Sequence, residues 1–195
     1  TKLEGLKWSA LTHIGDNAFF SCELLSLILD EDTFKSLSSL GKTAFNNDTA
    51  ITGTVVLPES ITEIPESAFS NTGITDVDFS HITSIGNGAF KNCAGLTELK
   101  LSDSVTAIGD SAFSGTGISG ELVLPDSITK IGSDAFNNVK ITGSLVLPKS
   151  LITLGGRAFR ITDIGDVTIP GTLKIIGPYS FYGCQNLSNV VFSEG

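Results

Sequence analysis

The most regular feature of the chain is a pattern of apolar and polar positions that recurs about every 23 residues. A pair of residues, Ala-Phe in seven copies and Ser-Phe in the eighth, marks each repeat. An aliphatic residue stands five positions before each Phe, and Gly follows that residue in seven of the eight copies. The repeated aromatic residues are Phe19, Phe45, Phe69, Phe90, Phe113, Phe136, Phe159 and Phe181. A unit this short cannot bury its own apolar side, so it must stack on copies of itself.

A short block of alternating residues precedes each of these pairs, as in Val55-Val56-Leu57 and Leu122-Val123-Leu124. Alternation with a period of two predicts a half-buried β-strand. Pro often follows the block and ends the strand, because it lacks an amide donor. The Ala-Phe pair then predicts a tight helical or 3₁₀ turn, with the Phe rings stacked in the interior. The predicted strands are 55–57, 77–79, 99–101, 122–124, 145–147, 167–169 and 190–192.

The fullest copy runs from Leu96 to Phe113 and resembles the BspA-like class of leucine-rich repeats. The resemblance covers essentially the whole chain. It implies a leucine-rich repeat solenoid of about eight coils, mainly β, with one parallel β-sheet face and short 3₁₀, helical or irregular turns. A right-handed β-helix is the alternative fold. One strong strand and one Ala-Phe turn per coil favour the leucine-rich type.

We expect residues 1–195 to form a single solenoid domain, because no Pro/Ser-rich linker or charge run divides them. The one irregularity is Asp30–Leu40, which we expect to bulge as a loop or as a short extra helical turn. We expect Trp8 to cover the first coil. A solenoid end without a polar cap exposes its core. We therefore expect the chain to be a fragment, with more repeats or another domain on at least its C-terminal side.

Composition excludes several classes of protein. The net charge is −9, which disfavours nucleic acid as a partner, since a strong binder needs a basic face. The mean hydropathy of +0.25 is too high for a disordered chain. No apolar run approaches the roughly 20 residues of a membrane helix, so we expect no membrane insertion in this segment.

The reactive residues do not converge on a catalytic or metal site. Cys22, Cys93 and Cys184 share one repeat position but lie three and four coils apart, too far for intrachain disulfides. We expect them to be small buried residues. His13 and His81 occupy different repeat positions in different coils. The sequence therefore predicts no catalytic residues, no metal, no cofactor and no enzyme activity.

The candidate site is the exposed side of the predicted sheet. The middle residue of each of these seven strands points outward, as does Ile28 at the same repeat position, and five of these eight residues are apolar. The column two residues earlier carries four acids and no base. An apolar stripe beside acids is typical of a protein-binding face, although β-branched residues also suit strands that bind nothing. The candidate residues are Val56, Asp76, Asp78, Glu98, Lys100, Glu121, Val123, Val146, Asp166 and Thr168.

The family resemblance implies a function as well as a fold. Similar proteins act as adhesins, so we expect a non-catalytic protein-binding module of a secreted or cell-surface protein. Its partner would be a host or partner-cell protein, with extracellular-matrix proteins such as fibronectin or fibrinogen as examples. The alternative is a structural spacer solenoid that projects another domain from the cell surface. The extracellular or cell-surface location rests on the resemblance alone.

Overall fold

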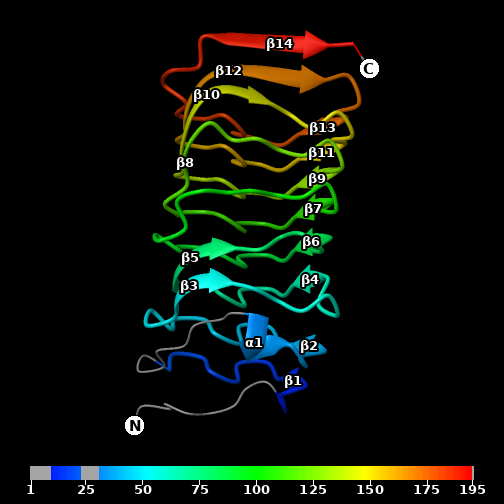
Figure 1. Ribbon diagram of the computed structural model, residues 1–195. Helices are drawn as coiled ribbons and strands as arrows, with labels where there is room; N and C mark the ends of the chain where they lie inside the picture. The colour runs from blue at the N-terminus through cyan, green and yellow to red at the C-terminus, as the bar shows by residue number, and fades with distance from the viewer. Residues whose placement is uncertain (1–9, 23–30, 195) are drawn as a thin grey trace.

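The computed structural model describes residues 10–22 and 31–194, which form a stack of coils joined by parallel strands (Figure 1). Two parallel sheets, one of two strands and one of four, run along the side that we call the sheet face. Trp8 and Asp30 lie outside the described residues. The strands of the sheet face are β3 (Thr52–Val55), β5 (Gly73–Val77), β8 (Ser119–Gly120), β10 (Lys140–Val146), β12 (Asp163–Pro170) and β14 (Asn189–Ser193).

The register of the sheet face aligns equivalent residues of successive coils. In the pairing of β10 with β12, Ser144 lies opposite Asp166 and Val146 lies opposite Thr168. Most strands begin several residues earlier than the alternation predicted. The predicted strands at 99–101 and 122–124 are wrong, because these segments join no ladder, although their alternation of inward and outward residues remains. The alternation therefore predicted which side chains are buried in these two segments, but it did not predict whether their backbones form hydrogen bonds with neighbouring strands.

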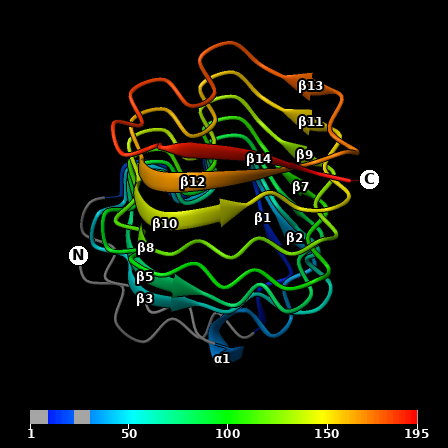
Figure 2. The same cartoon turned by 90° about the horizontal axis from the view of Figure 1, so that it is seen from above.

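A second series of parallel strands, which we call the corner ladder, follows the aliphatic-Gly positions on another side of each coil, as one sheet of two strands and one of six (Figures 1 and 2). The sequence predicted one sheet, because two-residue strands are too short to show alternation. A Cβ atom added to Gly132 would lie 2.5 Å from the backbone nitrogen of Asp110, so the corner Gly permits close stacking. The strands are β1 (His13–Ile14), β2 (Ser39–Leu40), β4 (Glu63–Ile64), β6 (Ser84–Ile85), β7 (Ala107–Ile108), β9 (Lys130–Ile131), β11 (Thr153–Leu154) and β13 (Ile175–Ile176).

The predicted ladder of Phe rings is confirmed and forms the centre of the core. Neighbouring rings are stacked, with centroids 5.2–5.8 Å apart and planes within 13° of parallel. The Asp30–Leu40 segment contains the extra helical turn, α1 (Glu31–Phe34). Phe34 and Leu37 are buried, and the Phe34 ring lies 6.1 Å from that of Phe45. The insertion therefore adds to the core.

The Ala-Phe turns have an unusual backbone. The residues two before and two after each ladder Phe have positive φ, between 51° and 77°. Asn, Asp and Gly tolerate this conformation best. The turn donates hydrogen bonds toward the next coil, as from the Phe113 amide to the carbonyl of Ala135 (2.9 Å). In the corner ladder the amides donate toward the preceding coil, as from the Gly132 amide to the carbonyl of Ile108 (2.8 Å).

The position three residues after the ladder Phe faces the interior in most coils. Where it is Thr, the hydroxyl donates to the carbonyl of the Phe, as from Thr116 to Phe113 (2.9 Å). Asp48 occupies this position in its coil and is fully buried. Neither of its carboxylate oxygens forms a hydrogen bond of ordinary geometry. Burial raises the pKa of Asp48 from 3.8 to about 6, and the nearby amides of Ala50 and Ile51 offset part of the rise.

The three cysteines also stand at this position, and all three thiols are free. Cys93 is buried, and its thiol donates to the carbonyl of Phe69 (3.0 Å). Cys184 is half-buried. The prediction of a buried residue is wrong for Cys22, which is exposed. Cys22 lies in the first described coil, where no described coil packs beneath it.

Candidate functional site

The sheet face displays the ten candidate residues that the sequence selected. Val123 and Val146 lie on successive coils with 77% and 56% of their surface exposed. Among the acids, Asp166 is half-buried. Val56 and Thr168 are half-buried as well. The remaining candidates are exposed, namely Asp76, Asp78, Glu98, Lys100 and Glu121.

Several of the charges on this face already have partners. The Lys100 ammonium lies 2.7 Å from the Glu98 carboxylate, within one strand block. This contact lowers the pKa of Glu98 and raises the pKa of Lys100. Asp166 accepts a hydrogen bond from the Ser144 hydroxyl (3.2 Å), and Asp76 accepts one from the amide of Val77 (2.9 Å). Lys100 therefore offsets the charge of Glu98, whereas Asp76 and Asp166 keep their negative charges.

A hollow of about 600 Å³ adjoins the sheet face at Val56 and Asp78. Its lining includes Lys35, Pro58, Ser80 and His81. The Ser80 hydroxyl lies 3.3 Å from Nδ1 of His81. Asp78, however, accepts a hydrogen bond from the backbone amide of Ser80 and does not orient the imidazole. These groups therefore do not form the Ser-His-Asp relay of a hydrolase.

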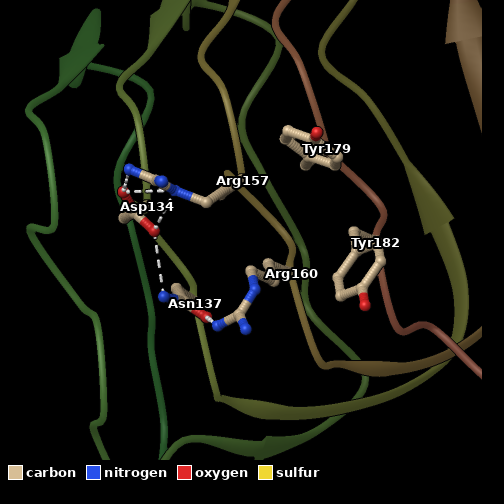
Figure 3. Close-up of a pocket in the computed structure, with 6 residues that line it drawn as sticks. All are labelled: Asp134, Asn137, Arg157, Arg160, Tyr179 and Tyr182. Carbon is tan, nitrogen blue, oxygen red and sulfur yellow. Dashed lines mark hydrogen bonds and ion pairs between the residues drawn. The ribbon is translucent and has the colours of Figure 1, made fainter.

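A second hollow, of about 700 Å³, lies beside the Ala-Phe turns of three successive coils (Figure 3). We call it the Arg–Tyr hollow, and the sequence reasoning missed it. A signal was present, since the only two Arg and the only two Tyr residues of the chain fall at the same two repeat positions of adjacent copies. The lining residues are Asp134, Asn137, Arg157, Arg160, Tyr179 and Tyr182.

The described residues offer neither a metal-binding cluster nor a membrane-spanning helix. Among residues 10–22 and 31–194, no group of three or more His, Cys, Asp and Glu side chains has a geometry that could hold a metal ion. Within the same residues, no helix has the length and apolar character needed to cross a membrane.

The sequence profile described as "BspA type Leucine rich repeat region (6 copies)" matches residues 12–120 and 119–195. The chain belongs to the BspA-type leucine-rich repeat family. The resemblance noted from the sequence is thereby confirmed. The fold of this family generally serves as a repeat scaffold and is generally not enzymatic. No curated protein matches the chain.

Solved structures support the same fold for this BspA-type solenoid. A leucine-rich repeat protein from Bacteroides ovatus is similar with a TM-score of 0.55 and 20% identity, over 94% of this chain and 59% of that protein. A leucine-rich repeat protein from Eubacterium ventriosum is similar with a TM-score of 0.54 and 23% identity, over 73% of this chain and 38% of that protein. This chain therefore spans less than two thirds of the length of either protein.

Proposed function

We propose that this solenoid is a non-catalytic protein-binding module of a secreted or cell-surface adhesin. It recognises a host or partner-cell protein through the sheet face, and matrix proteins such as fibronectin and fibrinogen are the first partners to test. The observation that carries the proposal is the exposed pair Val123 and Val146 on successive coils. Exposed apolar side chains at equivalent positions of successive coils favour an interaction site.

The acids beside this pair give the partner a preferred charge. Glu121 is exposed and stands two residues before Val123, while the half-buried Asp166 lies opposite Ser144 on the adjoining strand. A basic segment of a partner would approach this face faster than a neutral one, because complementary charge raises the rate of association. The membership of the family supports the same kind of role, since repeat solenoids offer extended binding surfaces.

The test is a binding panel with a matched control. Fibronectin, fibrinogen, laminin and mucin are immobilised, and the chain is compared with the double variant Val123→Glu/Val146→Glu. The control is Ile152→Glu/Ile175→Glu, which adds two acids at exposed apolar positions, one directly before β11 and one within β13 of the corner ladder. Circular dichroism checks that each protein is folded.

We expect the chain to bind one of these partners and the sheet-face variant to lose at least ten-fold in affinity, as for interface positions that contribute more than about 1.4 kcal/mol. The control should bind as the unmodified chain does. Equal loss in both variants would count against the sheet face as the site. No binding to any partner would favour a spacer solenoid that projects another domain.

A further inference from the structure

The Arg–Tyr hollow combines side chains that the solenoid itself does not require. Its six residues come from three successive coils, and each coil supplies the residue two before and the residue one after its ladder Phe. In the five preceding coils these two positions hold mostly small or polar residues. They are Asn17 and Phe20, Thr43 and Asn46, Ser67 and Ser70, Gly88 and Lys91, and Ser111 and Ser114.

The backbone gives no reason for large side chains at the first of these positions. Arg157 and Tyr179 have φ of 57° and 61°, a region that favours Asn, Asp and Gly. In the two inner coils the residues at these positions, Asp134, Asn137, Arg157 and Arg160, are half-buried or exposed, so side chains at these positions do not complete the core. Coil stacking therefore does not explain why the only arginines and tyrosines of the chain gather here.

The two arginines differ in how their guanidinium groups are engaged. Arg157 donates from Nε and Nη2 to the Asp134 carboxylate, at 2.8–3.1 Å, in a two-pronged ion pair. Arg160 makes one long contact, 3.5 Å from Nη1 to Oδ1 of Asn137. Among the described residues, no carboxylate lies within ion-pair distance of Arg160. Its planar fork is therefore available to an incoming carboxylate.

The ring of Tyr182 lies beside the guanidinium group of Arg160 (Figure 3). The Arg160 guanidinium carbon lies 5.7 Å from the centroid of the Tyr182 ring. The rings of Tyr179 and Tyr182 are 5.8 Å apart and nearly perpendicular, at 88°. A ligand that meets Arg160 would therefore also meet an exposed aromatic ring and a phenol hydroxyl.

We propose that the Arg–Tyr hollow binds a terminal sugar that carries a single carboxylate, of the sialic acid or uronic acid class. Arg160 pairs with the carboxylate, a Tyr ring packs against the C–H face of the sugar ring, and Asn137 and the phenol hydroxyls bind its hydroxyl groups. The volume of about 700 Å³ lies within the range of small-ligand sites. The site is independent of the sheet face and of the protein-binding function proposed above.

Charge and lining select this ligand over other anions. Two arginines and one aspartate give the cluster a charge of about +1, in a chain whose net charge is −9. The rest of the molecule would repel a long polyanion much more strongly than a ligand with a single carboxylate. No aliphatic side chain lines the hollow, and every lining residue can form hydrogen bonds. A polyhydroxylated ring matches this lining better than the apolar side chains of a peptide.

The experiment is an NMR titration of the whole chain with four small probes. N-acetylneuraminic acid and glucuronic acid test the proposed class, galactose tests a neutral sugar, and N-acetyl-glutamate tests a carboxylate from a peptide. The variants are Arg160→Gln, Arg160→Lys and Tyr182→Leu. The control is Lys149→Gln, which removes an exposed cation paired with Asp126 at 2.8 Å. Thermal unfolding identifies which variants are folded.

We expect an acidic sugar to bind with a Kd on the order of 1 mM, as befits a single small ligand. Galactose and N-acetyl-glutamate should bind at least ten-fold more weakly. Arg160→Gln should abolish binding, and Arg160→Lys should weaken it several-fold because the fork is lost while the charge is kept. Lys149→Gln should leave it unchanged. No binding of either acidic sugar at 20 mM ligand, equal binding of galactose, or equal binding of N-acetyl-glutamate would overturn the proposal.

Discussion

The buried carboxylate of Asp48 makes the stability of the solenoid depend on pH. Asp48 occupies a position where three other coils place a buried Thr, and the hydroxyl of that Thr donates to the carbonyl of the ladder Phe. Replacing Asp48→Thr removes the buried acid and supplies the side chain that this position holds elsewhere. We therefore expect the variant to be more stable than the unmodified chain at neutral pH.

The structure sets the size and the sign of the effect. The pKa of Asp48 rises from 3.8 to about 6 on folding, because burial disfavours the charged form. At 1.36 kcal/mol per pKa unit, ionisation costs the folded state about 3 kcal/mol. The folded state binds the proton more tightly than the unfolded state, so stability is retained below pH 3.8 and falls as pH rises from 3.8 to 6.

The assay is urea and thermal unfolding, followed by circular dichroism, from pH 3.5 to 8. Asp48→Thr should exceed the unmodified chain by about 3 kcal/mol above pH 6, equivalent to about 6–12 °C in Tm for a chain of this size. The difference should shrink as pH falls toward 3.8. The control is Asp103→Thr, the same change at an exposed position. A stability difference between Asp48→Thr and the unmodified chain that stays constant between pH 4 and pH 7 would refute the reasoning.

Three further predictions concern the core, the corners and the turns, each measured as the free energy of unfolding in urea. Phe113→Ala should cost about 3–5 kcal/mol, because it empties the middle of the Phe ladder; a loss below 1 kcal/mol would contradict the packing. Gly132→Ala should cost about 1–3 kcal/mol, because the added Cβ atom would collide with the backbone of the neighbouring coil. Gly15→Ala is the control and should leave the stability unchanged, because no described atom lies within 4 Å of the added Cβ. Ile161→Asn should gain about 1 kcal/mol by relieving a positive φ of 54° at a β-branched residue, and a loss would show that the Ile side chain contributes more than the strain.

The repeat made the core predictable, because each buried position is specified eight times. The Phe ladder and the inward residues of each coil followed directly from the spacing of the repeat. The corner ladder did not follow, because a two-residue strand has no period to detect. Its Gly residues were visible in the sequence, but the reason for them is a backbone contact with the neighbouring coil.

The functional surface was harder to predict than the core, since it consists of departures from the repeat. The exposure of Val123 and Val146 could be foreseen from alternation. The Arg–Tyr hollow could not be foreseen in the same way, because its equivalent residues lie 22 or 23 positions apart in the sequence, on coils that had to be stacked first. Asp48 is a departure of the same kind, and its burial becomes evident only when its repeat position is compared with the others.

The opposite directions of the coil-to-coil hydrogen bonds affect the electrostatics of the molecule. In an α-helix, peptide dipoles align and add along the axis. Here the Phe113 amide points toward one end of the stack, and the Gly132 amide points toward the other. The two sets of peptide dipoles largely cancel, so the electric field along the axis does not grow as coils are added. Long-range attraction of a charged ligand must then come from side chains alone, and a few substitutions could reverse it without disturbing the backbone.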